Sequence, residues 1–101
     1  YLAGSNETNM YWLKVADDAL SGDGILPGDL ALISEPAPYL QNQIGLVYCP
    51  DGKTHLCRVF QQQNHLILQF SNPLYQPLIY TEKDRNKVVI LGKLKEIRRK
   101  Y

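Results

Sequence analysis

The amino-acid sequence predicts a mostly β domain. Short apolar and β-branched runs recur along the chain, and clusters of Gly, Pro, Asn and Asp separate them. No stretch keeps a helical period over the length that a domain-building helix needs. The 101 residues fit one domain, and 45% hydrophobic with 21% charged residues is the balance of a chain that buries one core. We therefore expect an all-β architecture of several short strands.

The expected strands follow one another at short intervals. Pro-Asp-Gly-Lys at positions 50–53 is typical of a β-hairpin turn. Pro77 keeps the segment after it short or at a sheet edge, because proline cannot donate to a ladder. Gly92 marks a bulge or a bend in the last strand region. Residues 1–10 are expected to be a flexible leading segment and residues 11–101 the folded domain, with strands at 11–16, 30–34, 44–49, 55–60, 66–70, 88–91 and 93–97.

Composition argues against several classes of function. A net charge of +1 gives no overall indication of nucleic-acid binding. The longest apolar run is far too short to cross a membrane, and no signal-peptide pattern opens the chain. Two cysteines that are expected to be free thiols favour a cytoplasmic protein. Cys49 and Cys57 lack the spacing and the companion ligands of a zinc site, so we expect no metal and no cofactor. A disulfide is not expected, because Cys49 should oppose a residue near Thr54 across the hairpin.

Four segments carry motifs that stand in an informative order. In the segment at 24–30, Gly24 and Gly28 supply backbone freedom, and Asp29 can accept backbone N–H bonds. The segments read LKVADDAL at 13–20, GILPGDL at 24–30, THLCRV at 54–59 and NPLYQP at 72–77. Together they resemble the peptidase domain shared by LexA, UmuD-type mutagenesis proteins and phage repressors. The resemblance runs from residue 13 to the C-terminus and implies the β-fold that these proteins share with type I signal peptidases.

The resemblance also places two catalytic positions on residues that lack the required chemistry. A Ser–Lys dyad needs a hydroxyl as nucleophile and a desolvated amine that takes its proton. The family's Ser position falls on Ala19 and its Lys position on Cys57. Ser21 lies two residues past the nucleophile position, and Lys53 lies in the hairpin turn. We therefore expect a degenerate peptidase fold that is not an enzyme, whose former cleft is formed by Asp17, Asp18, Ala19, His55 and Cys57.

Two features resemble parts of an active peptidase: a Cys–His pair and an Ala-Gly cleavage sequence. His55 and Cys57 share a face of one strand, but side chains at i and i+2 lie roughly 6 to 7 Å apart, too far for a direct bond. Family members cleave themselves at an upstream Ala-Gly or Cys-Gly bond, and Ala3-Gly4 has that sequence. It lies only about ten residues before the first expected strand, so we interpret it as a chance match.

In LexA-like proteins the C-terminal strands pair across a two-fold axis, so the resemblance implies a homodimer. A terminal strand at a sheet edge has unpaired N–H and C=O groups, which the pairing of two copies satisfies. The apolar residues expected at this interface are Val88, Ile90, Leu94 and Ile97. The basic end of the chain, residues 93–101, is expected to be a solvated charge cluster rather than a DNA-binding surface.

The resemblance implies the dimerisation and regulatory domain of a transcription factor. DNA contacts would come from a separate N-terminal domain, and a chain that opens with Tyr1 instead of Met looks like a fragment of a longer protein. A dimerising domain raises the effective concentration of the second DNA reader at its half-site. Two alternatives stay open: a self-cleaving peptidase trapped by a Ser-to-Ala change, and a module that docks a peptide or ligand in the former cleft. The loss of both dyad residues favours natural degeneration over an engineered trap.

Overall fold

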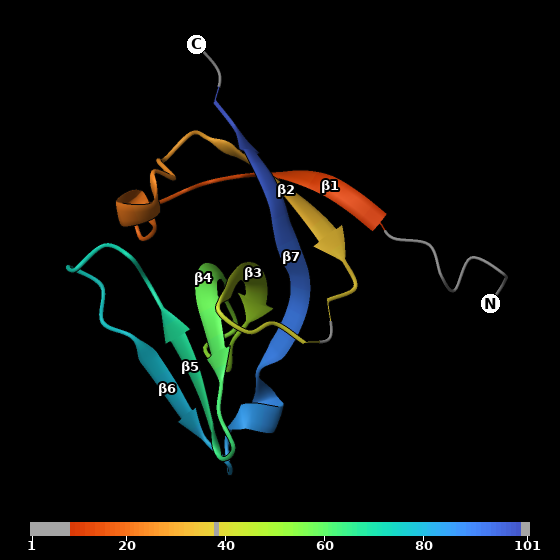
Figure 1. Cartoon of the computed structure of the whole chain (residues 1–101), viewed down its shortest axis with the longest axis vertical. Helices are drawn as coiled ribbons and strands as arrows, with labels where there is room; N and C mark the ends of the chain where they lie inside the picture. Colours follow the sequence, from red (N-terminus) through yellow and green to blue (C-terminus); the bar gives the residue numbers. More distant parts are fainter. Residues whose placement is uncertain (1–8, 38, 100–101) are drawn as a thin grey trace, which may run out of the picture.

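The computed structural model describes residues 9–37 and 39–99, which form one antiparallel sheet of seven strands. The order across the sheet is β1-β2-β7-β3-β4-β5-β6, and the sheet is strongly curved (Figure 1). Two short 3₁₀ turns, η2 (Ser21–Asp23) and η3 (Arg85–Lys87), interrupt the connections. The strands are β1 (Asn9–Lys14), β2 (Leu30–Glu35), β3 (Gln43–Tyr48), β4 (Thr54–Gln61), β5 (His65–Gln69), β6 (Leu78–Thr81) and β7 (Val89–Arg98). The predicted mostly β fold is confirmed.

The first strand differs from its prediction at both ends. β1 begins at Asn9, so the last two residues of the expected flexible segment belong to the sheet, while residues 1–8 lie outside the described residues. β1 ends at Lys14 rather than at residue 16. The reason is its partner: the ladder runs from Asn9 opposite Glu35 to Lys14 opposite Leu30, where β2 starts. Strand length is therefore set by the pairing and not by the apolar run alone.

The central hairpin and the edge strand form as predicted. β3 and β4 pair up to Tyr48 opposite Thr54, and the backbone N–H of Lys53 donates to Asp51 Oδ1 at 2.9 Å. Gly52 has a φ of 83°, which the turn requires and which glycine adopts without steric cost. β6 has only 4 residues, follows Pro77 and lies at the end of the sheet. Cys57 lies opposite Gly45, so it is out of register with Cys49, and both thiols are free.

The C-terminal strand is not the exposed edge strand that the sequence suggested. β7 lies between β2 and β3 and pairs with both of them. β3 covers residues 89–93 of this strand and β2 covers residues 93–98, so among the described residues each half of β7 is paired on one side only. The expected pairing of two copies through this strand stays a prediction. The four residues expected at the dimer interface contribute to the interior, because Val88 is buried and Ile90, Leu94 and Ile97 pack against buried clusters.

Two bulges explain the irregular apolar spacing of β7. Against β3 the ladder shifts so that Leu91 is extra, next to the predicted irregularity at Gly92. Against β2 it shifts so that Lys95 is extra, which lets Leu94 and Ile97 reach the same cluster although they are three positions apart. A bulge re-aims the side chains that follow it, so strict alternation is lost without loss of pairing.

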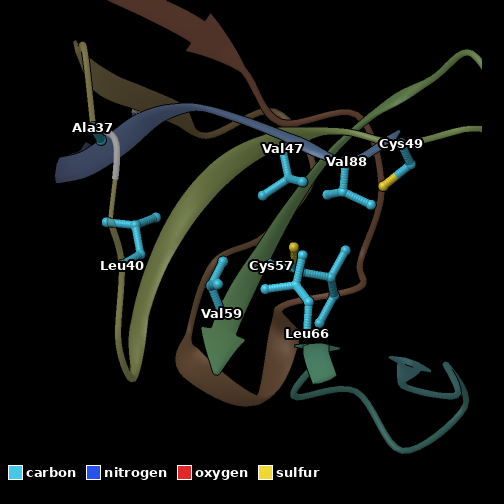
Figure 2. Packing of buried hydrophobic residues seen from close by; sticks show 9 residues of the cluster. Ala37, Leu40, Val47, Cys49, Cys57, Val59, Leu66 and Val88 are labelled. Carbon is cyan, nitrogen blue, oxygen red and sulfur yellow. The ribbon is translucent and has the colours of Figure 1, made fainter. Parts of the chain in front are cut away.

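The buried side chains form two clusters on opposite faces of the sheet. In β3, Val47 belongs to the first core and its neighbour Leu46 to the second. Figure 2 shows the first core, where Val47, Val59 and Leu66 gather near Cys57. The second core lies beneath the end of the sheet made by β1 and β2, and it includes Val15, Leu20, Ile25, Ala31 and Ile33. This second core supports the loop that leads from β1 to β2.

Candidate functional site

The connection from β1 to β2 forms a closed loop, which we call the 15–29 loop. Its ends are joined because the N–H of Val15 donates to the carbonyl of Asp29, and the N–H of Gly28 donates to that of Val15, both at 2.8 Å. Gly24 and Gly28 have φ values of 81° and 92°, as their role in turns requires. The predicted backbone freedom at these two glycines is confirmed. Ala19 lies within this loop and is 3% exposed.

Asn72 holds the middle of the 15–29 loop against the loop between β5 and β6, and Figure 1 shows the two loops close together. Its side-chain N–H donates to the carbonyl of Asp18 at 3.0 Å, and its backbone N–H donates to that of Ala19 at 3.0 Å. Its side-chain oxygen accepts the N–H of Leu74 at 2.9 Å. The hydroxyl of Tyr75 donates to Asp18 Oδ1 at 2.9 Å, and this hydrogen bond raises the pKa of Tyr75. The Asn-Pro-Leu-Tyr segment at 72–75 thus fixes the position of Ala19 relative to the loop between β5 and β6.

Arg99 holds the far end of the same loop. Its guanidinium donates Nε–H to Asp29 Oδ1 and Nη2–H to Asp29 Oδ2, both at 2.9 Å, and Nη2–H also reaches the carbonyl of Gly24 at 2.7 Å. Asp29 is 2% exposed and also accepts the N–H of Leu26 at 2.9 Å. The Arg99 hydrogen bonds and the one from Leu26 lower the pKa of Asp29 to about 2. The role expected for Asp29 as an acceptor of backbone N–H bonds is confirmed, and the partnership with Arg99 adds to it.

Two adjoining pockets open where the 15–29 loop passes the start of β4, and together they are called the cleft here. Both are lined by Asp17, His55 and Leu56. One pocket has a volume of about 270 Å³ and is also lined by Ala19, Asp51, Phe70, Tyr75, Gln76 and Leu78. The other has a volume of about 170 Å³ and extends along Leu13, Lys14, Val15, Ala16, Leu20, Leu46 and Thr54. The lining combines apolar side chains with two exposed carboxylates, those of Asp17 and Asp51.

The expected site residues do not all reach this cleft. Asp17, Ala19 and His55 line it, whereas Asp18 is turned toward the hydroxyl of Tyr75. Cys57 has no exposed surface and lies in the first core, where burial raises the pKa of its thiol. Its thiol contacts the backbone carbonyl of His55 at 4.0 Å rather than the imidazole. The two side chains therefore form no thiolate–imidazole pair.

His55 stands between the two pockets and is held from two sides. Its Nε2 lies 3.2 Å from Asp51 Oδ2, and its ring meets the ring of Phe70 edge-on at 6.2 Å between centroids. The hydrogen bond from the N–H of Lys53, followed by the bond with His55, lowers the pKa of Asp51. The imidazole is therefore oriented by a carboxylate beside the cleft.

Three residues of the site were not singled out from the sequence. Asn72 and Tyr75 stood within a recognised motif, but the residues that they contact lie more than 50 positions earlier in the chain. Arg99 stood within a run of cations that was interpreted as a solvated cluster, and its ion pair with Asp29 overturns that interpretation for this residue. No local pattern identifies such partners, because the contacts depend on how β7 and the β5–β6 loop are placed in space.

Two features of other protein classes are absent from the described residues. Across 9–37 and 39–99, no three His, Cys, Asp or Glu side chains come together as a group that could hold a metal ion. The same residues include no helix that is long and apolar enough to cross a membrane.

Comparison with known proteins agrees with the motifs and the geometry. Residues 2–95 match the family described as Peptidase S24-like. The LexA repressor of Citrifermentans bemidjiense is 36% identical over 84 residues, which are 83% of this chain and 41% of that protein. The LexA repressors of Listeria innocua and Anaeromyxobacter dehalogenans are 28% and 31% identical over 93% and 99% of this chain, and each match covers 43% of the relative. The chain thus spans less than half the length of these relatives. With nearly its whole length matched, the chain belongs to the Peptidase S24-like family, and LexA repressors are among its relatives.

Proposed function

We propose that this chain is the C-terminal dimerisation and regulatory domain of a LexA-like or phage-repressor-like transcriptional regulator, and that it does not cleave itself. The observation that carries the proposal is the pair of residues at the former catalytic positions. Ala19 offers a methyl group in the loop that should present a nucleophile, and Cys57 is a buried thiol. The fold of the family is retained while its chemistry is lost.

No serine and no cysteine lines the two pockets. Lys14 and Thr54 line the smaller pocket, and both are exposed to solvent. Burial raises the pKa of Cys57, so its thiol stays protonated near neutral pH and takes no proton from a nucleophile. Lys53, in the hairpin turn, is exposed to solvent, and a catalytic lysine needs desolvation to act as a base. Loss of self-cleavage follows from the chemistry of these side chains.

DNA binding by the parent protein belongs to the same proposal. The relatives are named repressors, and each is more than twice as long as the segment that this chain matches. We assign DNA contacts to a separate N-terminal domain, and we assign to this domain the pairing of two copies in the cytoplasm. Pairing places two DNA readers on one operator and raises the effective concentration of the second reader.

The first test is a self-cleavage assay on the full-length parent at alkaline pH. It compares the wild type, Ala19→Ser, and Ala19→Ser with Cys57→Lys, and Ala16→Ser with Cys57→Lys serves as the matched control on the same loop. The proposal expects no cleavage by the wild type or by Ala19→Ser alone. Cleavage by the wild type would refute the proposal, and cleavage by Ala19→Ser alone would identify a trapped form of a working peptidase. Cleavage by the double variant only would show that the cleft is otherwise intact.

A second candidate function is the docking of a peptide or ligand without cleavage, and the shape of the cleft favours it. Two pockets adjoin along Asp17, His55 and Leu56, and apolar side chains line both of them. We expect a capped peptide of residues 1–8 to shift the imidazole resonances of His55 at millimolar concentration. His65 is exposed on β5 and serves as the internal reference. Equal or absent shifts at the two histidines would rule out docking of this peptide in the cleft.

A further inference from the structure

We propose that the larger pocket of the cleft binds an alkylammonium group, either the side chain of a lysine in a peptide or a free small amine. Such binding rests on the second candidate function, docking without cleavage, since it specifies what the cleft would hold. The pocket brings together aromatic rings and carboxylates, the two kinds of group that bind organic cations in proteins.

The size of the pocket suits a single side chain. Its volume is about 270 Å³, whereas pockets for drug-sized ligands are roughly 300 to 1,000 Å³. The side chains of Leu56 and Leu78 and the methyl group of Ala19 line it. Apolar surface of this kind covers the aliphatic stem of a lysine, whose charged end stays in a polar environment. An unbranched alkyl chain with one charged end therefore matches both the volume and the lining.

Three aromatic rings line the same pocket, those of His55, Phe70 and Tyr75. The rings of Phe70 and His55 lie 6.2 Å apart between centroids with their planes inclined at 74°. Those of Phe70 and Tyr75 lie 5.7 Å apart and are inclined at 45°. Because the planes are inclined, the rings form adjoining walls instead of a flat stack. The face of an aromatic ring attracts a cation, and ammonium groups are recognised in pockets with several such rings.

The charged side chains that line this pocket are carboxylates. Asp17 and Asp51 are both exposed, and among the described residues neither a lysine nor an arginine lines the pocket. Asp17 Oδ1 accepts the N–H of Ala19 at 3.1 Å, and Asp51 Oδ1 accepts that of Lys53 at 2.9 Å. These bonds to the backbone hold both carboxylates in place beside the rings. An ammonium group in the pocket would therefore meet negative charge that is already oriented.

The negative charge extends along the cleft to the loop between β5 and β6. The pKa of Tyr75 is raised by its hydrogen bond with Asp18, and the charges of Asp18 and Asp17 add to the increase. Lys53 offsets part of the charge near Asp51, and Lys14 lines the smaller pocket. Three carboxylates still outnumber these two lysines. The cleft therefore favours a cationic ligand over an anionic one.

The experiment is an NMR titration of the chain in low salt with two probes that differ only in charge. N-acetyl-lysine N-methylamide carries an ammonium group, and N-acetyl-norleucine N-methylamide has the same four-carbon side chain without it. The lysine probe should shift the imidazole resonances of His55 and not those of the exposed His65. It should bind at least about fivefold more tightly than the norleucine probe, and added salt should reduce the difference.

Two variants separate the contributions of charge and ring. Asp17→Asn removes one negative charge and keeps the oxygen that accepts the N–H of Ala19, and it should weaken binding of the lysine probe about two- to fivefold. Phe70→Leu removes a ring and should also weaken binding about two- to fivefold, and circular dichroism checks that it is folded. Asp84→Asn makes the same change outside the pocket and should leave binding unchanged.

A third probe distinguishes the two sources of the ammonium group. n-Butylammonium has the stem and the charge of a lysine side chain without the peptide backbone. Tighter binding of the capped lysine than of n-butylammonium would support a peptide as the ligand. Equal binding of the two would support a free small amine.

The outcomes distinguish this site from the docking function on which it rests. Equal binding of the lysine and norleucine probes overturns the preference for a cation and leaves docking in place. A peptide of residues 1–8 that shifts His55 when the lysine probe does not has the same meaning. Absence of binding by every probe and by that peptide overturns both. Tighter binding of the lysine probe that is reduced in Asp17→Asn but not in Asp84→Asn establishes the site.

Discussion

At the scale of single residues, polar side chains connect segments that lie far apart in the sequence. Asp29 is buried at the end of the 15–29 loop and accepts hydrogen bonds from Arg99 and Leu26. Asn72 donates hydrogen bonds to the carbonyls of Asp18 and Ala19 in the middle of the loop. A buried polar group must be paired, because an unpaired one costs its full desolvation free energy. These two side chains therefore determine where the loop stands above the sheet.

The Asp29–Arg99 pair gives the protein a predictable response to acid. The pKa of Asp29 in the fold is about 2, below its ordinary value of 3.8, so its contribution to stability is present above pH 4. It is lost as the pH falls from about 4 through about 2, because the carboxylate must then take up a proton. We expect the melting temperature of the wild type to fall across this window, and that of Asp29→Asn to be lower at neutral pH but flatter in acid.

Asp84→Asn is the matched control for this pH profile. Asp84 forms a surface ion pair with Lys87 at 3.5 Å, and exposed pairs contribute little. Its melting curve against pH should follow that of the wild type. If Asp29→Asn also followed the wild type, the buried carboxylate would not contribute to stability.

At the scale of elements, β7 is the strand on which the sheet depends. It pairs with β2 on one side and β3 on the other, and it sends side chains to both cores through its two bulges. The strands approach closely at its glycine. A Cβ atom on Gly92 would lie 2.5 Å from Ile33 Cγ2 and 3.0 Å from the carbonyl oxygen of Ser34. Glycine is required here for space and not for an unusual backbone angle.

Replacement of this glycine gives a prediction about packing. Gly92→Ala should lower the free energy of unfolding by about 1 to 3 kcal/mol, because the added methyl overpacks β7 against β2. The measurement is the midpoint of urea unfolding. Gly52→Asn is the control, since no atom lies within 4 Å of a Cβ there and Asn tolerates a positive φ. A change within about 0.5 kcal/mol is expected for the control, and an equally small change for Gly92→Ala would contradict the close approach.

At the scale of the whole molecule, one continuous sheet joins the two cores. Leu46 and Val47 are neighbours in β3, yet each belongs to a different core. β7 joins β1 and β2 to the remaining strands, because it pairs with both β2 and β3. We therefore expect the chain to unfold as a single cooperative unit.

This cooperativity has a direct test in the single tryptophan. Trp12 lies on β1 and reports on the end of the sheet made by β1 and β2, whereas far-UV circular dichroism reports on the whole sheet. The two signals should give the same urea midpoint in the wild type. Leu68→Ala lies in the first core and should lower the free energy of unfolding by about 2 to 5 kcal/mol by both signals. A Trp12 midpoint that did not move in this variant would show that the two cores unfold independently.

The sequence by itself determined the fold class, the central hairpin, the short edge strand after Pro77 and the order of the family motifs. These features depend on local chemistry: β-branched runs, the positive φ that glycine allows, and the N–H that proline lacks. It also identified Ala19 and Cys57 as the residues at the catalytic positions of the resemblance. Local patterns were sufficient to predict these features, because each feature depends on residues that lie close together in the sequence.

Only the tertiary structure decided which strand is an edge. β7 closes the chain in sequence but lies inside the sheet, because β2 and β3 are adjacent to it in space and not to each other. The same placement brings Arg99 to Asp29 and buries Cys57 in the first core instead of in the cleft. Pairing between strands far apart in the sequence is set by the summed burial and hydrogen bonding of the whole sheet, which no short segment contains.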